Sequence, residues 1–97
     1  MAGYRLSRLA EIELTDIATY SLETWGIDQA TRYIDALEAC CQRLANNPQM
    51  GRTCEDVRPG LRRMEYERHV LFYRVEAEGI LVSRILHQRM LPKKHAI

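Results

Sequence analysis

The sequence has few cysteines, few lysines and no long apolar run, and each shortage excludes a class of protein. No stretch approaches the roughly eighteen consecutive apolar residues of a membrane-spanning helix. Acids interrupt the N-terminal segment, where a signal peptide needs an unbroken apolar run, so we expect a cytoplasmic protein. The three cysteines form neither a CxxC pair nor a Cys/His ligand spacing, which argues against a zinc site and a disulfide framework. We expect Cys40 and Cys41 to be small apolar fillers on a helix, and we expect no metal or cofactor.

What the chain does contain is an ordinary globular composition with an uneven distribution of charge. Its 97 residues, 46% hydrophobic and 28% charged, suit one domain spanning residues 1–97 and are too few for two. The net charge is +1 overall. Residues 1–48 carry four arginines against seven acids, whereas residues 49–97 carry ten basic residues against six acids. The basic half therefore hints at an anionic partner.

The first half has helical periodicity. Apolar residues recur at steps of three and four from Arg8 to Trp25, with Ser7 as a suitable N-cap and Gly26 as a suitable C-terminal stop. We expect Asp28 to cap a second helix, which ends at Asn46-Asn47-Pro48 because the residue before a proline is pushed out of the helical region. The few residues around Gly26 predict an antiparallel helical hairpin.

The second half has the character of strands. Three runs are rich in β-branched and aromatic residues: 61–67, 69–75 and 80–86. Residues 76–79 have the length and glycine of a hairpin loop, residues 49–60 read as a loop, and residues 3–6 alternate like a short strand. The order β-α-α-β-β-β predicts an α+β fold, with the N-terminal helical hairpin packed on a small, mainly antiparallel sheet.

Three long stretches resemble the RelE/ParE superfamily of bacterial toxins, and specifically its ParE branch. They are YRLSRLAEIELTDIATYSLETWG near the start, ALEACCQRLANNPQMGR in the middle and VRPGLRRMEYERHVLFYRVEAEGILVSRILHQRMLPKKH at the end. The closing RILHQRM-x-P-x-x-H is the most specific part of this resemblance, which spans nearly the whole chain. The chain departs from the family pattern at Leu91, where an acid is common.

The resemblance implies the toxin of a type II toxin–antitoxin module, neutralised by an antitoxin from the same operon. In the ParE branch the antitoxin usually has a ribbon-helix-helix DNA-binding N-terminus and a C-terminal segment that wraps the toxin. The usual target of this branch is DNA gyrase, whereas the RelE branch cleaves messenger RNA on the ribosome. Because ribbon-helix-helix proteins dimerise, a symmetric assembly with two toxins is the default expectation.

A ribosome-dependent ribonuclease is the enzymatic alternative, and without a metal it needs proton donors and acceptors together with cations for the phosphorane. Its candidate residues are Arg62, Arg68, Arg84 and His87. The RelE pattern also includes a lysine-rich surface and often a C-terminal tyrosine. Here the lysines are Lys93 and Lys94 alone, and no tyrosine follows Tyr73. We therefore predict a non-enzymatic toxin; the third alternative is an inactive homologue that only forms the antitoxin complex.

Three apolar residues of the first helix, Leu9, Ile12 and Tyr20, lie away from its core-facing stripe, on a face that also bears acids. Such a patch is either covered by the N-terminal strand or left for a partner. We predict that these residues contact the antitoxin. By contrast, we predict that Trp25 and Tyr33 are core anchors at the turn of the hairpin.

Further antitoxin contacts are predicted on the strands. Four residues share a strand parity: Arg62, Met64, Tyr66 and Arg68. They either line an open sheet face that accepts acidic antitoxin side chains or form a charged, solvated edge. Arg84, the last predicted antitoxin contact, interrupts an apolar strand. Because burial of an unpaired guanidinium is costly, Arg84 must pair with an acid or reach an exposed groove.

The C-terminal segment is the part that we predict is presented to the target. We interpret RILHQRM as the end of the last strand and the start of a tail, although His87 also has the simpler role of a satisfied polar residue at a strand end. Strict alternation places Arg84 on the same face as Ile80 and Val82, and His87 on the other face. The predicted target-binding residues are His87, Arg89, Met90, Lys93, Lys94 and His95.

Overall fold

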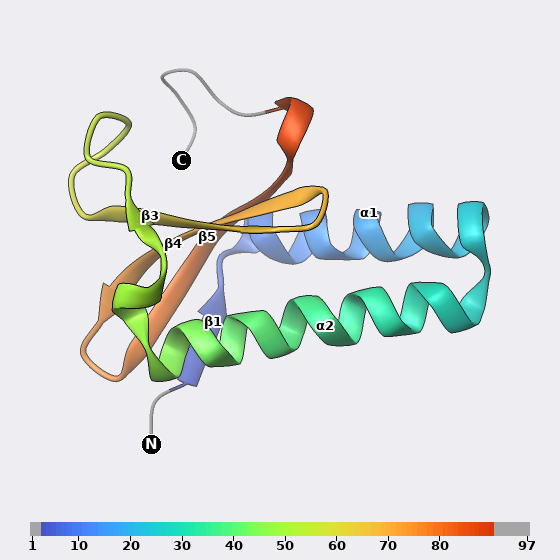
Figure 1. Ribbon diagram of the computed structural model, residues 1–97, viewed down its shortest axis with the longest axis horizontal. Coiled ribbons are helices and arrows are strands. Elements are labelled where there is room, and N and C mark those ends of the chain that lie inside the picture. The colour runs from blue at the N-terminus through green and yellow to red at the C-terminus, as the bar shows by residue number, and fades with distance from the viewer. Residues whose placement is uncertain (1–2, 91–97) are drawn as a thin grey trace.

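The computed structural model describes residues 3–90 and confirms the predicted α+β fold (Figure 1). In chain order, its elements are β1 (Gly3–Leu6), α1 (Arg8–Trp25), α2 (Ile27–Asn46), the 3₁₀ turn η1 (Pro48–Met50), β2 (Arg52–Thr53), β3 (Leu61–Tyr66), β4 (His69–Glu76), β5 (Gly79–His87) and the 3₁₀ turn η2 (Gln88–Met90). Neither α1 nor α2 is long and apolar enough to cross a membrane.

One sheet contains five of these strands, in the order β1-β5-β4-β3-β2. Its pairs are antiparallel except β1 with β5, which run parallel. The sequence did not predict η1 or β2, because a two-residue strand carries no periodic signal and the segment 49–60 is polar. The four other strands lie where the sequence places them.

The two helices form the predicted hairpin, joined by Gly26 alone. Gly26 has a φ of +88°, which an L side chain rarely adopts, and this lets the chain reverse within a single residue. The prediction that Asp28 caps α2 is therefore wrong: α2 already begins at Ile27, and Asp28 lies in its first turn. At the other end of α1, Ser7 Oγ accepts a hydrogen bond from Ala10 N (3.0 Å) and donates one to Ser83 O (2.7 Å) on β5.

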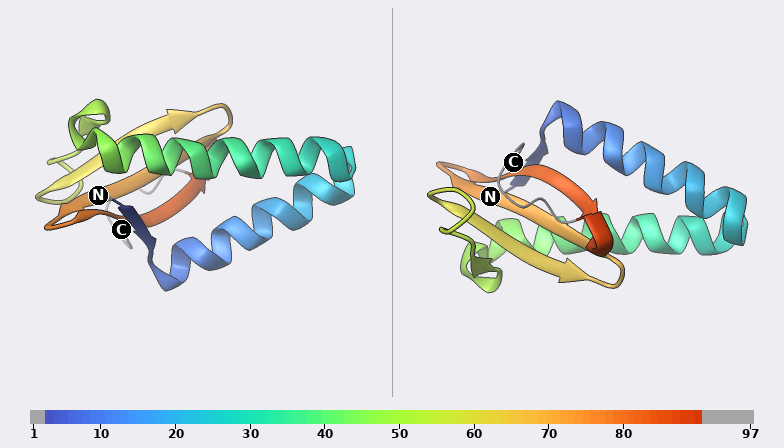
Figure 2. Two further views of the ribbon diagram at one scale, coloured as in Figure 1. Left: turned by 90° about the horizontal axis from the view of Figure 1, so that it is seen from below. Right: turned by 90° about the horizontal axis from the view of Figure 1, so that it is seen from above.

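The hairpin packs on one face of the sheet, and its tip projects beyond the strands (Figures 1 and 2). The main core, between helices and sheet, has Leu37, Leu44, Leu71, Tyr73 and Ile80 among its buried residues. A smaller cluster on the opposite face contains Cys54, Leu61, Val70, Phe72 and Leu86. The two clusters explain why the sequences of β4 and β5 are apolar at both parities. Cys40 and Cys41 are buried in the main core, as predicted.

A β-bulge at Ser83 divides β5 into two halves. Tyr73 lies opposite Val82, but Phe72 lies opposite Arg84, so Ser83 is an extra residue on β5. The expectation of strict alternation is therefore wrong for this strand: Val82 and Ile85 both lie in the main core, and Arg84 falls on the opposite face. The bulge places Ile85 and His87 on the side of the helices.

At the C-terminal end of α2, a buried hydroxyl closes the layer formed by the helices and the sheet. Tyr73 is fully buried, and its hydroxyl donates to Pro48 O (2.7 Å) and accepts from Gly51 N (3.0 Å). Arg62 adds hydrogen bonds from Nε and Nη2 to Gly51 O (3.1 and 2.8 Å). A Cβ on Gly51 would lie 2.3 Å from the Tyr73 hydroxyl and 2.7 Å from Arg63 O, so only glycine fits here. We call Pro48, Gly51, Arg62 and Tyr73 the closed end.

Candidate functional site

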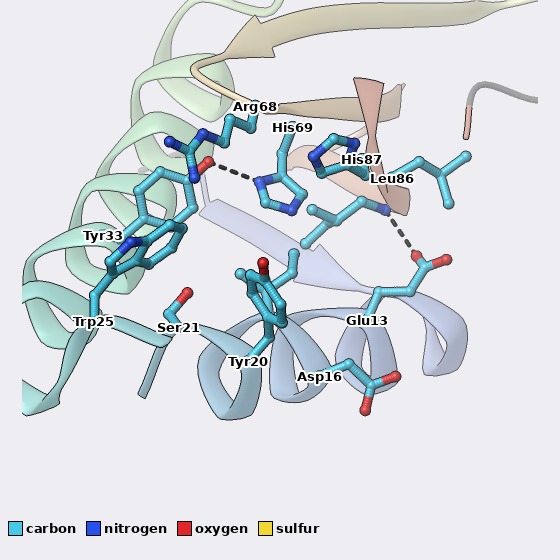
Figure 3. Close-up of a pocket in the computed structure, with 12 residues that line it drawn as sticks. Glu13, Asp16, Tyr20, Ser21, Trp25, Tyr33, Arg68, His69, Leu86 and His87 are labelled. Atoms are coloured by element: carbon cyan, nitrogen blue, oxygen red, sulfur yellow. Dashed lines mark hydrogen bonds between the residues drawn. The ribbon is translucent and has the colours of Figure 1, made fainter. Parts of the chain in front are cut away.

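At the opposite end of the same layer, a cavity of about 370 Å³ opens between α1, the first turns of α2 and the adjacent ends of β4 and β5. Its lining residues are Glu13, Asp16, Ile17, Tyr20, Ser21, Trp25, Tyr33, Arg68, His69, Ile85, Leu86 and His87 (Figure 3). We call this cavity and its rim the groove. Because β1 ends at Leu6, opposite Val82, the edge of β5 beyond Val82 has no neighbouring strand here.

Aromatic side chains form one wall of the groove. Tyr20 is 61% exposed and Trp25 is 37% exposed, and their rings pack edge to face with centroids 5.8 Å apart. The guanidinium of Arg68, from the β3–β4 turn, lies 4.8 Å from the centroid of the Trp25 ring. The prediction that Trp25 is a core anchor is therefore wrong, since its ring lies on the wall of an open groove. Exposed aromatic surface beside a cavity is typical of a binding site.

A cross-strand pair of histidines forms the opposite wall. His69 lies opposite His87 on β4 and β5, with ring centroids 5.4 Å apart. The hydroxyl of Tyr33, which is partly buried against the core, lies 2.7 Å from His69 Nδ1. Burial lowers the pKa of His69 to about 4, and the neighbouring His87 and Arg68 act in the same direction. His69 is therefore neutral at neutral pH and presents an uncharged ring to the groove.

Below the groove, a carboxylate occupies the exposed edge of β5. Glu13 Oε1 accepts from Ile85 N (2.8 Å), and Glu13 Oε2 accepts from Arg84 Nε (2.8 Å) and Nη2 (2.7 Å). Both side chains of this ion pair are 17% exposed. Of the two roles left open for Arg84, the structure shows the ion pair with an acid. This pair fastens α1 to β5 beyond the last residue of β1.

The structure brings together only some of the predicted antitoxin contacts. Leu9, Ile12 and Tyr20 are all exposed on one flank of α1, so β1 does not cover them. Tyr20 and Arg68 both line the groove. Leu9 and Ile12 extend the same flank toward the start of α1. Neither Leu9 nor Ile12 lines the groove itself.

The remaining predicted contacts lie elsewhere. Met64 and Tyr66 pack against the main core under the helices, so the sheet face predicted to be open is covered. Arg62 is hydrogen bonded at the closed end. The expectation failed because the sequence does not show which face of the sheet the hairpin covers.

The predicted target-binding residues are described only in part. His87 lines the groove, and its Nδ1 accepts from Arg89 N (3.1 Å), while the side chain of Arg89 is exposed. Met90 is the last residue of η2. Lys93, Lys94 and His95 lie outside the described residues.

Sequence reasoning missed the central residues of the groove, namely Asp16, Trp25, Tyr33 and His69. Val75 pairs with Ile80 next to the hairpin loop. If this register continued along β4 and β5 without a bulge, His69 would pair with Leu86. The bulge at Ser83 shifts this register by one, so the two histidines meet only in the folded strand pair. Within residues 3–90, no group of three or more His, Cys, Asp or Glu side chains could hold a metal ion.

Comparison with solved structures supports the fold. The chain superimposes with a TM-score of 0.75 on a structure titled "Chromosomal ParDE TA system from P. aeruginosa", at 23% sequence identity, over 90% of this chain and 96% of that chain. At this level of identity the likeness shows the fold alone. A model of the family described as "ParE toxin of type II toxin-antitoxin system, parDE" matches residues 4–92.

Comparison with curated sequences gives closer relatives. The chain is 44% identical over 88 residues to "Toxin ParE1" of Mycobacterium tuberculosis, covering 90% of each chain. It is 43% identical over 95 residues to "Toxin ParE1" of Caulobacter vibrioides, covering 98% of each. It is also 37% identical to "Toxin ParE" of Escherichia coli over 91 residues, 93% of this chain and 88% of that one. The match of fold, family model and near full-length relatives shows that this chain belongs to the ParE toxin family of type II toxin–antitoxin systems.

Proposed function

We propose that this protein is an active toxin that inhibits DNA gyrase, and that a ParD-like antitoxin neutralises it by occupying the groove. The observation that carries the antitoxin site is the exposure of Tyr20 and Trp25 beside a cavity of about 370 Å³. With Leu9 and Ile12, these residues form an apolar surface along α1 that a partner would bury. The antitoxin is expected to carry a ribbon-helix-helix domain, which would make the complex a symmetric hetero-oligomer.

The geometry of the cationic residues supports a non-enzymatic mode of action. The ribonuclease hypothesis needs Arg62, Arg68, Arg84 and His87 to converge on one phosphate. Instead, Arg62 is hydrogen bonded to backbone carbonyls at the closed end, and Arg84 is paired with Glu13. Arg68 and His87 lie together in the groove, but Arg62 is not among the residues that line it. These placements favour a protein that acts by binding its target, in the bacterial cytoplasm where gyrase works.

The C-terminal segment is proposed to contact gyrase. The exposed Arg89 begins this surface, and the sequence continues it with Lys93, Lys94 and His95. A cationic and apolar segment suits an anionic surface on the target. Replacement of Lys93 and Lys94 by glutamate is expected to relieve gyrase inhibition while leaving antitoxin binding intact, because these lysines are predicted contacts of the target and not of the antitoxin.

The decisive experiment compares two targets in parallel. The refolded toxin is incubated with gyrase, relaxed plasmid and ATP, and separately with translating ribosomes. We expect loss of supercoiling and the appearance of linear DNA, with messenger RNA left intact. Cleaved messenger RNA with normal supercoiling would instead establish the ribonuclease, and no effect in either assay would indicate an inactive homologue.

The antitoxin part of the proposal has its own test. Co-expression with the antitoxin from the same operon should raise the melting temperature, because a ligand that binds only the folded state stabilises it by mass action. The same complex should leave gyrase active. An unchanged melting temperature and gyrase inhibited equally with and without the antitoxin would contradict this part.

A further inference from the structure

The two rims of the groove carry opposite charge. Figure 3 shows Asp16 of α1 on one side and Arg68 on the other, whereas Glu13 is paired with Arg84 and His69 is neutral. Asp16 is exposed, and Glu23, seven residues further along α1, points within about 20° of it at 100° per residue. Tyr20 lies between them on the same stripe. Asp16 and Tyr20 line the cavity, and the exposed Glu23 continues their stripe along α1 beyond it.

The opposite rim is basic. Arg68 is exposed, and the Trp25 ring holds its guanidinium at the mouth of the cavity. The exposed Arg89 follows His87 at the end of β5. The exposed Glu67 precedes Arg68 in the β3–β4 turn and, like Glu23 and Arg89, does not line the cavity. A partner lying in the groove thus meets acids on its α1 side and arginine on its sheet side.

The shape of this surface suits a helix better than a strand. Leu9 and Tyr20 are eleven residues apart on α1, a separation of about 16 Å or three helical turns. An added strand would need the exposed edge of β5. Gln88 N donates a hydrogen bond to Arg68 O, so the backbone groups of Gln88 point toward β4. Because these groups alternate along a strand, the N–H and C=O groups of Ile85 and His87 point away from β4, toward the exposed edge. The Glu13 carboxylate already accepts from the Ile85 amide.

We propose, building on the groove as the antitoxin site, that the occupant is one amphipathic helix whose two flanks carry opposite charge. Its apolar stripe fills the cavity beside Tyr20 and Trp25. Lysine or arginine on one flank faces Asp16 and Glu23, and aspartate or glutamate on the other flank faces Arg68. Because reversal of a helix exchanges its flanks, this arrangement also sets the direction in which the partner helix runs along the groove.

The test uses three helical peptides with the same apolar stripe and no tryptophan. The acid-and-base peptide has acidic residues on one flank and basic residues on the other. The acid-and-acid peptide has acidic residues on both flanks, and the base-and-base peptide has basic residues on both. The quantity measured is the dissociation constant, read from the fluorescence of Trp25, the single tryptophan of the chain, at low ionic strength. We expect the acid-and-base peptide to bind about three- to tenfold more tightly than either of the others.

Toxin variants then exchange the preference. D16K/E23K should bind the acid-and-acid peptide most tightly, and R68E should bind the base-and-base peptide most tightly. D35K/E38K is the matched control, because it changes net charge equally on exposed residues that do not line the cavity. It should keep the original order of affinities. Circular dichroism of the bound peptides should show helix.

The outcomes separate this inference from the proposed function. Equal affinities for all three peptides, unchanged in the variants, would overturn the charge arrangement and leave the groove as a helix-binding site. A bound peptide with a β-type spectrum would overturn the helical occupant. If the fluorescence of Trp25 changes with the antitoxin but with none of the peptides, the helical occupant is also overturned. If the antitoxin itself leaves this fluorescence unchanged, the groove is not the antitoxin site.

Discussion

The two ends of the helix–sheet layer are built from similar residue types but differ in whether their polar groups are used internally. At the closed end, the tyrosine hydroxyl of Tyr73 and the guanidinium of Arg62 are hydrogen bonded to the backbone of residues 48–51. At the groove, Tyr20 and Arg68 are exposed, and the aromatic ring of Trp25 is the immediate neighbour of both. The first arrangement stabilises the fold. The second leaves aromatic and cationic surface for a partner.

The same contrast appears in the acids of the two halves. Glu65 on β3 accepts from Arg52 and Arg63 within the sheet, so its charge is used internally. Asp16, which lines the groove, and Glu23, further along the same stripe of α1, are both exposed. The uneven charge of the sequence therefore becomes two facing rims, rather than one uniformly basic surface.

The largest expected effect is at the closed end. Gly51→Ala should lower the free energy of unfolding by about 3 kcal/mol, because its Cβ would displace the Tyr73 hydroxyl from its two hydrogen bonds. Urea unfolding followed by circular dichroism measures this change. Gly3→Ala is the control, since nothing lies within 4 Å of the added Cβ. Equal losses in the two variants would show that the closed end is not tightly packed.

Removal of the hydroxyl alone should have a smaller effect. Tyr73→Phe should cost about 2 kcal/mol, because Pro48 O and Gly51 N lose their shared partner. Tyr20→Phe removes a hydroxyl from an exposed side chain at the groove and should leave urea stability within about 0.5 kcal/mol. Similar losses from both substitutions would remove the contrast between the two ends.

The third prediction reverses the contrast by measuring binding in place of stability. Tyr20→Ala should weaken antitoxin binding at least about tenfold, or about 1.4 kcal/mol, because an exposed aromatic at the centre of an interface is a common energetic anchor. Leu22→Ala is the control, since Leu22 is exposed on the same helix but does not line the cavity. Titration calorimetry would show the difference, and equal affinities in the two variants would argue against the groove.

The smallest effect concerns pH. The unfolded chain protonates His69 near pH 6.5, whereas the folded chain does so near pH 4, because burial disfavours the charged ring. The folded state therefore binds fewer protons between these values, and its stability should fall as pH falls through this window. We expect a loss of about 1 kcal/mol between about pH 7.5 and pH 5, after allowance for partial exposure.

Urea unfolding at both pH values measures this loss, and the His69→Asn variant shows how much of it comes from His69. The other titrating groups are unchanged in that variant, so its stability should depend less on pH in this range. An identical pH dependence in the two proteins would show that His69 is as accessible to protons in the folded chain as in the unfolded chain.

Local patterns in the sequence were sufficient for most of the fold. Helical periodicity, the Ser7 cap and the reversal at Gly26 specify the hairpin, since each depends on neighbours within about one turn. The β-branched runs specify β3, β4 and β5 for the same reason. The resemblance of nearly the whole chain predicted the family, which the comparisons confirm. Part of the groove was also foreseen, because Tyr20, which lines it, breaks the core stripe of α1.

Only the tertiary structure decided how these elements form a site. The bulge at Ser83 shifts the register of β5, which places His87 opposite His69 and sends Arg84 to Glu13. The helical hairpin covers the sheet face that bears Met64 and Tyr66, so these side chains are packed, whereas Trp25 remains exposed. Strand register and the choice of face depend on contacts between segments far apart in the chain. Local periodicity carries no information on these contacts, so the sequence by itself determined the elements and the family, and packing determined the groove.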